Sequence, residues 1–215
     1  MPETLIVNEI FHSIQGESTY AGLPCVFVRL TGCRLRCAWC DTAYAFDEGV
    51  AMSLDEIIFK VRAHGFPLVE ITGGEPLLQP NVLPLLTRLC NLGLTVLLET
   101  SGTEDIANVD PRVIKIMDLK SPSSGESAQN RCANLRHLTA KDEIKFVLAD
   151  RADYDWAKHQ LAEHDLGNRC AILFSPVWGK LPLKTLAEWI LADHLTVRLQ
   201  TQRQKHIWGP DTRGV

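Results

Sequence analysis

An apolar, β-branched segment leads directly into a loop with three cysteines in the stretch Val26-Phe27-Val28-Arg29-Leu30-Thr31-Gly32-Cys33-Arg34-Leu35-Arg36-Cys37-Ala38-Trp39-Cys40. The apolar part, Val26–Leu30, is typical of a buried strand. The cysteines have the spacing Cys-x3-Cys-x2-Cys, and a closed structural zinc site would need a fourth ligand. On a cluster of four irons, three thiolates leave one iron free to bind another molecule. The motif therefore predicts a catalytic iron–sulfur centre bound by Cys33, Cys37 and Cys40.

Two other interpretations of the cysteines stay open. Zinc could bind the same three thiolates with Cys25 or a distant histidine as the fourth ligand, although zinc sites more often show two separated pairs of ligands. A disulfide framework is disfavoured because the chain has seven cysteines, an odd number. The cysteines outside the motif lie in or beside apolar stretches and are predicted to be small buried hydrophobic residues: Cys25, Cys90, Cys132 and Cys170.

Apolar segments like Val26–Leu30 recur along the chain, and most are separated by helix-like stretches. The predicted strands are Val26–Leu30, Leu68–Ile71, Thr95–Glu99, Val113–Met117, Glu143–Leu148, Ala171–Phe174 and Thr196–Leu199. One helix begins at the capping box Ser53-Leu54-Asp55-Glu56 and ends at Gly65. The other predicted helices are Asn81–Leu92, Arg151–His164 and Leu183–His194, and Ser121–Asn130 is predicted to be a loop.

This alternation predicts a largely parallel sheet that helices cover on its outer side. In such sheets the active-site residues gather at the carboxyl ends of the strands. A polar motif follows five of the seven predicted strands, so we expect one rim to carry all five motifs. These motifs are the cysteine loop, Thr72-Gly73-Gly74-Glu75-Pro76, Thr100-Ser101-Gly102, Asp118-Leu119-Lys120 and Ser175-Pro176.

The composition limits the classes of function. With 215 residues, 46% apolar content and 22% charged content, the chain fits a single globular domain spanning residues 1–215. A formal net charge of −4 gives no electrostatic reason to expect nucleic-acid or membrane binding. No secretion signal or membrane-spanning run is apparent, and free thiols suit a reducing compartment, so a cytoplasmic location is expected.

The three cysteines, the aromatic residue before the last of them, and a Gly-Gly-Glu after the next strand resemble the radical S-adenosylmethionine (SAM) enzymes. The flanking residues resemble, more narrowly, the 7-carboxy-7-deazaguanine synthase family of that superfamily. The stretches that carry this resemblance are Asn8-Glu9-Ile10-Phe11, Ser13-Ile14-Gln15-Gly16-Glu17, Arg29-Leu30-Thr31-Gly32-Cys33, Cys40-Asp41-Thr42, Ile71-Thr72-Gly73-Gly74-Glu75-Pro76 and Ile207-Trp208-Gly209-Pro210-Asp211.

The resemblance implies an α/β fold, an abbreviated open (β/α) partial TIM-type barrel, paired as a homodimer. It implies a carbon–nitrogen lyase of queuosine and deazapurine biosynthesis that converts 6-carboxy-5,6,7,8-tetrahydropterin to 7-carboxy-7-deazaguanine with loss of ammonia. The implied cofactors are a 4Fe-4S cluster, SAM and Mg²⁺, and a low-potential protein such as flavodoxin is the implied electron donor. Because the cofactors carry the radical chemistry, no residue is assigned as catalytic.

The resemblance also implies roles for individual residues. The cluster is assigned to Cys33, Cys37 and Cys40, and Mg²⁺ to Thr42. The SAM-binding residues are Trp39, Cys40, Asp41, Gly74, Asp118, Leu119, Lys120, Phe174, Ser175, Pro176 and Val177. The substrate-binding residues are Ile14, Gln15, Gly16, Arg29, Thr72 and Glu99.

The chain departs from the family's usual pattern in three of these segments. Many members have Ser-Pro-Lys in place of Asp118-Leu119-Lys120 and Gln-Pro in place of Ser175-Pro176. Gln204-Lys205 stands where many members have His-Lys, and His206 follows directly, which leaves open whether His206 takes the place of that histidine.

Simpler interpretations exist for the same residues. Arg29 is expected to share a strand face with Phe27, where its guanidinium would hold a substrate carboxylate or form a structural ion pair. Thr42 would cap a helix or turn rather than bind Mg²⁺, Trp39 would be a hydrophobic plug, and Gly73-Gly74 an ordinary turn.

Two other functions fit parts of the pattern. A glycyl-radical-enzyme activase shares the cluster spacing but gives no reason for Arg29 or for Ile14-Gln15-Gly16-Glu17. A non-catalytic zinc- or cluster-binding module would share the cysteines alone.

Overall fold

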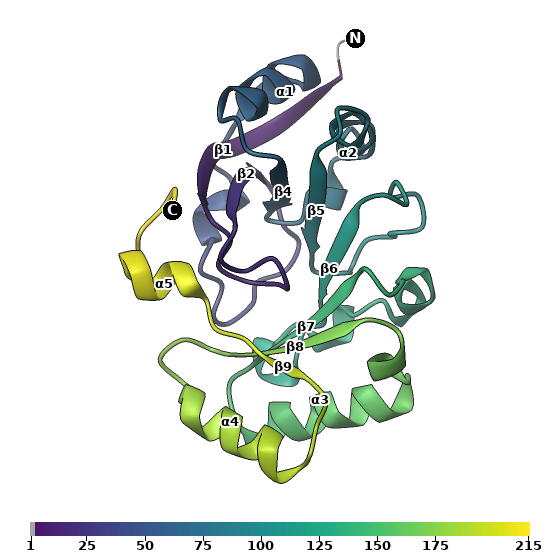
Figure 1. Cartoon of the computed structure of the whole chain (residues 1–215), viewed down its shortest axis with the longest axis vertical. Coiled ribbons are helices and arrows are strands. Elements are labelled where there is room, and N and C mark those ends of the chain that lie inside the picture. The colour runs from purple at the N-terminus through teal and green to yellow at the C-terminus, as the bar shows by residue number, and fades with distance from the viewer. Residues whose placement is uncertain (1–2) are drawn as a thin grey trace.

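The computed structural model describes residues 3–215 and forms one nine-stranded sheet (Figure 1). Every neighbouring pair from β2 to β9 is parallel, whereas β1 pairs antiparallel with both β2 and β3. The sheet ends at β3 and β9 and does not close, which confirms the open partial barrel. In sheet order the strands are β3 (Val50–Ser53), β1 (Thr4–Ile14), β2 (Pro24–Leu30), β4 (Leu68–Gly73), β5 (Thr95–Thr100), β6 (Ile114–Asp118), β7 (Glu143–Leu148), β8 (Ala171–Pro176) and β9 (Arg198–Leu199).

The antiparallel strands β1 and β3 were not predicted from the sequence. β1 buries only Leu5 and Val7 completely, and the four residues of β3 are exposed or half-buried. Strands with so little burial lack the continuous apolar run that marks the central strands. The predicted strand Thr196–Leu199 shortens to Arg198–Leu199, and the other predicted strands match within one or two residues.

Helices α1 (Leu54–Ala63), α2 (Val82–Asn91), α3 (Arg151–Glu163) and α4 (Leu183–Ala192) lie around the outer side of the curved sheet (Figure 1). All four confirm the sequence prediction. The capping box starts α1 as expected, because the Ser53 side chain accepts a hydrogen bond from the Glu56 backbone N–H at 3.2 Å. The main hydrophobic core fills the space between the sheet and these helices, with Val28, Ile71 and Phe146 among its members.

No α-helix joins β5 to β6 or β6 to β7 within residues 3–215; turns connect β5 to β6, and short 3-10 helices stand between β6 and β7. Two of them, Pro122–Ser124 and Ser127–Gln129, lie in the predicted loop Ser121–Asn130. Among residues 3–215, none of the helices combines the length and apolar character that a bilayer crossing requires.

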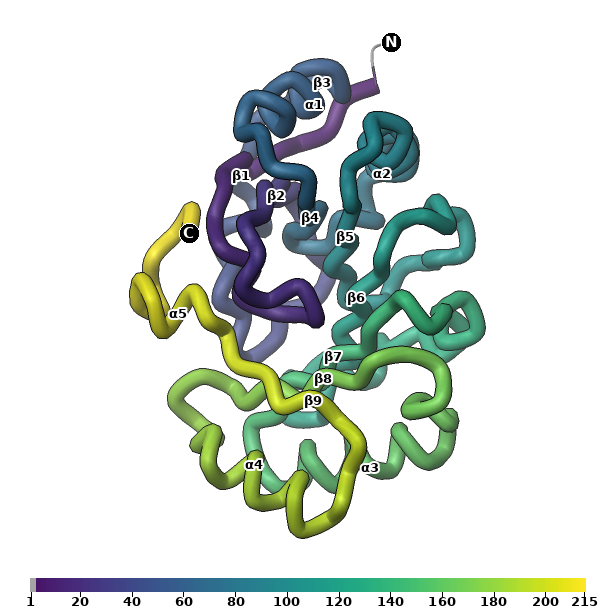
Figure 2. Tube along the Cα trace, in the orientation of Figure 1, coloured from purple at the N-terminus to yellow at the C-terminus, as the bar shows by residue number. Residues whose placement is uncertain are grey.

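The C-terminal segment passes from β9 across the strands and ends beside β1 (Figure 2). After β9 it forms α5 (Arg203–Trp208), a short helix that the sequence did not predict. The backbone N–H of Arg203 donates to the carbonyl of Gly16 at 3.1 Å, which ties this segment to the β1–β2 loop.

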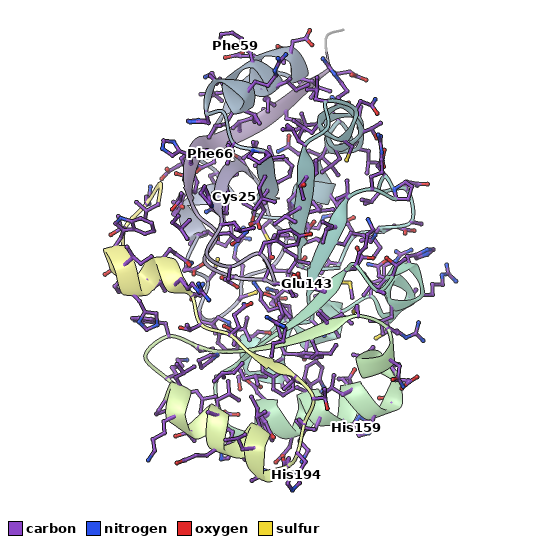
Figure 3. All side chains as sticks on the ribbon, viewed as in Figure 1. Cys25, Phe59, Phe66, Glu143, His159 and His194 are labelled. Carbon is purple, nitrogen blue, oxygen red and sulfur yellow. The ribbon has the colours of Figure 1, made fainter. Side chains whose placement is uncertain are left out.

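The prediction that the four cysteines outside the motif are buried is confirmed for Cys25 and holds in part for Cys90 and Cys170, which are half-buried. Cys25 is fully buried among the strands, unlike the exposed Phe59 of α1 (Figure 3), and Cys90 and Cys170 pack against the core. Cys132 is exposed, and its prediction is wrong. It begins a 3-10 helix on the surface of the β6–β7 connection, where no apolar neighbour covers it from outside.

Candidate active site

The inner face of the sheet, opposite the helices, lines a cavity of about 480 Å³. This volume lies within the usual range for small-molecule sites. Because side chains alternate along a strand, alternate residues toward the carboxyl ends of β2, β4, β5, β6 and β7 line it. Strand pairing places these side chains side by side: Arg29 with Thr72, and Asp118 with Lys145. The prediction that Phe27 and Arg29 share a face is confirmed, since both line the cavity.

The cysteine loop leaves the carboxyl end of β2 and closes one side of the cavity, which Cys33, Cys37 and Cys40 all line. Two hydrogen bonds connect the loop to the segment that follows β6. The backbone N–H of Ala38 donates to Ser124 O at 3.0 Å, and that of Arg36 donates to a carboxylate oxygen of Glu126 at 2.6 Å. The 3-10 segments after β6 therefore hold the loop in place.

The Gly-Gly-Glu turn after β4 holds the other end of the loop. A Cβ on Gly74 would lie 1.9 Å from the Gly32 carbonyl oxygen, so only glycine fits at Gly74. The Glu75 backbone N–H donates to that same oxygen at 2.7 Å. Gly74 was expected to allow close approach to a ligand, but in this structure its backbone closely approaches the cysteine loop. The Glu75 carboxylate accepts hydrogen bonds from Thr100 and Ser101 and so links the ends of β4 and β5.

The three cysteines fit a cluster. Burial raises the pKa of the Cys33 and Cys37 thiols, and the nearby Lys120 ammonium opposes this effect by favouring the thiolates. Among residues 3–215, no three His, Cys, Asp or Glu side chains converge tightly enough to hold one metal ion. A cubane cluster does not require that convergence, because each thiolate binds a different iron.

Most residues expected to bind SAM line the cavity beside the cysteines: Trp39, Asp41, Gly74, Asp118, Lys120, Ser175, Pro176 and Val177. The side chains of Leu119 and Phe174 are buried in the core instead. Asp118 fits a polar ligand particularly well. Its Oδ2 accepts from Lys120 at 2.9 Å, whereas its buried Oδ1 has no hydrogen-bond partner among the described residues.

All six residues expected to bind the substrate also line the cavity: Ile14, Gln15, Gly16, Arg29, Thr72 and Glu99. The Arg29 Nε donates to Glu9 at 2.7 Å and its Nη1 donates to the Gly73 carbonyl at 3.2 Å. Arg29 thus forms the structural ion pair that was the alternative interpretation. Its Nη2 makes no hydrogen bond to residues 3–215 and is available to a ligand.

Thr42 and Trp39 are also placed by the structure. Thr42 precedes the 3-10 helix Ala43–Phe46, but its hydroxyl does not cap that helix and has only a 3.8 Å contact with the Cys40 Sγ. Trp39 is half-buried, with the Lys180 ammonium 5.7 Å from the centre of its ring.

Sequence reasoning missed several charged residues of the site. Lys145 and Glu70 are buried on the inner face, and both line the cavity with Glu17. A signal was present, because each is a charged residue inside an otherwise apolar strand segment. Such residues are rarely buried without a partner. The Glu70 carboxylate accepts a hydrogen bond from Gln15 at 2.5 Å.

The C-terminal segment contributes further polar residues to the site, and the sequence around them did not predict this role. Lys205 pairs with Asp41 at 2.7 Å, and Gln202 donates to both Asp41 and Glu17. Burial alone would raise the pKa of Asp41, but Lys205 and Gln202 outweigh it and hold the pKa below its ordinary value. His206 is exposed and packs edge-on against Trp178, while Gln204 faces the cavity.

Two carboxyls in the cavity have pKa values near neutrality. Burial raises the pKa of Glu70 to about 7, and it raises that of Glu99 to about 8 in spite of the nearby Lys145 ammonium. Both carboxyls face the cavity beside Glu17 and Asp118, and this cluster of acidic side chains suits a ligand rich in hydrogen-bond donors.

Residues 27–118 match the radical SAM superfamily. The chain is 50% identical to 7-carboxy-7-deazaguanine synthase from Chlorobaculum tepidum over 98% of its own length and 97% of that protein. It is 49% identical to the synthase from Koribacter versatilis, over 97% of this chain and 99% of the relative. This chain belongs to the 7-carboxy-7-deazaguanine synthase family. The crystal structure of QueE from Escherichia coli has the same fold, with a TM-score of 0.77 and 25% identity over 93% of this chain and 94% of that one.

Membership of this family agrees with the cavity and disfavours the activase alternative. The family's radical SAM chemistry requires a 4Fe-4S cluster and SAM, and three cysteines of the cavity fit the cluster. An activase acts on a protein backbone and would not need Arg29 or the Ile14–Gly16 loop, yet both face the same cavity as the cysteines.

Proposed function

We propose that this chain, acting as one radical SAM domain over residues 1–215, converts 6-carboxy-5,6,7,8-tetrahydropterin to 7-carboxy-7-deazaguanine with loss of ammonia. One observation carries the proposal. The three cysteines and the residues expected to bind the substrate line a single cavity, at the carboxyl ends of six neighbouring parallel strands. Substrate and cofactor would therefore lie in contact, as hydrogen transfer requires.

The chemistry of each cavity residue indicates which part of the substrate or of SAM it would bind. Arg29 would bind the substrate carboxylate through its remaining N–H donors, while Glu9 and Gly73 keep the guanidinium in place. Gln15 and Glu99 would bind the pterin edge. Asp118 would accept a hydrogen bond from SAM through the buried Oδ1. When bound, the cluster and SAM supply the one-electron chemistry that removes a hydrogen atom from the substrate.

Three further parts belong to the proposal. The Thr42 hydroxyl, which caps no helix, would bind a Mg²⁺ ion that orients the substrate. An external low-potential protein such as flavodoxin would reduce the cluster, and two copies of the chain would form a homodimer.

An anaerobic assay tests the reaction. The protein is reconstituted with iron and sulfide, reduced, and incubated with SAM and the carboxypterin. We expect ammonia and a product with the mass of 7-carboxy-7-deazaguanine. A reconstituted protein that binds SAM but leaves the pterin unchanged would contradict the proposal.

The Mg²⁺ site has a separate test. Thr42→Ala removes the hydroxyl ligand, so turnover should become less dependent on Mg²⁺, while the cluster absorbance stays the same. The same Mg²⁺ dependence in wild type and variant would refute this role of Thr42.

A further inference from the structure

Lys145 forms the centre of a buried ionic network on the inner face of the sheet. Its Nζ lies 2.9 Å from Glu17, 2.5 Å from Glu99 and 3.8 Å from Asp118. The lysine side chain is only 8% exposed. Its partners come from the β1–β2 loop, β5 and β6, so one ammonium group connects three separate segments of the chain.

Two of those segments face the proposed substrate. Glu99 lines the cavity, and Glu17 directly follows the Ile14–Gly16 loop. The Glu17 carboxylate accepts two further hydrogen bonds, from Gln200 to its Oε2 at 3.0 Å and from Gln202 to its Oε1 at 2.9 Å. Lys145 therefore connects the loop to the sheet at the same point where it orients Glu99.

We propose that Lys145 is a positioning residue for substrate recognition: its ammonium group holds the Glu99 carboxylate in the cavity and fastens the Gln15–Glu17 loop to the sheet. The proposal rests on the proposed function, since the ligand that Glu99 receives is the donor-rich, guanidine-like edge of the pterin. A carboxylate accepts two hydrogen bonds from such an edge only when it is ionised and correctly oriented.

The groups that face Glu99 set the pH dependence of this contact. Lys145 on β7 favours the ionised carboxylate, whereas Glu70 on β4, Glu17 in the loop and Asp118 on β6 disfavour it. Burial and these carboxylates raise the pKa of Glu99 to about 8. Substrate binding should therefore tighten as the pH rises through about 8. Without Lys145 the transition should move to higher pH, because the cation that favours ionisation is gone.

The test compares Lys145→Met with a matched control in the cluster-loaded protein, with SAM present and no reductant. Lys115 is another buried, paired lysine, 3.2 Å from Asp142, but it lies on the opposite face of the sheet and does not line the cavity. Lys115→Met should leave pterin affinity unchanged. Lys145→Met should weaken pterin binding by about 10- to 100-fold, the usual effect of losing a charged hydrogen bond. Lys145→Arg should restore part of the affinity.

A second variant keeps the test valid if Lys145→Met does not fold. Glu99→Gln should weaken pterin binding and remove the part of its pH dependence that is centred near 8. Unchanged affinity in Lys145→Met, or an unchanged pH profile in Glu99→Gln, would overturn the role of Lys145. A wild-type protein that fails to bind the carboxypterin would instead contradict the proposed function.

Discussion

Gly74→Ala should disrupt the cysteine loop by forcing its backbone away from the Gly-Gly-Glu turn. A Cβ at this position would lie 1.9 Å from Gly32 O and 2.7 Å from Gly32 C, both of them backbone atoms. The two backbones would have to separate by roughly 1.5 Å to reach the 3.4 Å at which ordinary contact begins. That movement would also break the Glu75–Gly32 hydrogen bond of 2.7 Å.

The cost follows from the rigidity of both partners. Overpacking against a backbone that cannot rotate away costs about 3 kcal/mol, at the upper end of the usual range. For a chain of this size the melting temperature should fall by roughly 6–12 °C. Thermal unfolding of the metal-free protein measures the effect, and iron content after reconstitution should fall with it.

Gly167→Ala provides the control. A Cβ on Gly167 would meet nothing within 4 Å, and this glycine does not have a left-handed backbone conformation. Its melting temperature should stay the same or rise slightly, because alanine reduces the entropy of the unfolded chain. An unchanged melting temperature and a full complement of iron in Gly74→Ala would refute the claim that the cysteine loop requires glycine at this position.

Three further predictions follow from the site. Cys37→Ala should lose the brown absorbance of the cluster and all turnover, so full iron content would remove Cys37 from the ligand set. Arg29→Lys should raise the Michaelis constant for the pterin, since the charge stays but the planar fork is lost. Glu70 stabilises the fold at low pH, because its pKa is raised from 4.5 to about 7. The contribution of Glu70 to stability should be lost between about pH 4.5 and 7, so thermal unfolding curves of Glu70→Gln should show a smaller loss of stability over this range than those of the wild type.

Much of the fold could be predicted because its evidence is local. The central strands, such as β4 around Ile71, are largely apolar runs. The capping box of Ser53 and Glu56 predicts the start of α1. β1 was missed because it is a half-exposed strand whose pairing depends on β2 and β3. Cys132 was predicted to be buried but is exposed, because burial depends on which distant segments of the chain pack over a residue.

The three-thiolate motif, the parallel arrangement of strands and the rim on which polar residues collect could all be predicted from the order of residues along the chain. Which of those polar groups meet depends on how the strands pack. Lys145 and Glu17 are 128 positions apart, and their contact depends on strand order and on the direction in which each strand presents alternate side chains. Local patterns describe neighbours along the chain, whereas a buried ionic network is made by segments that packing brings together.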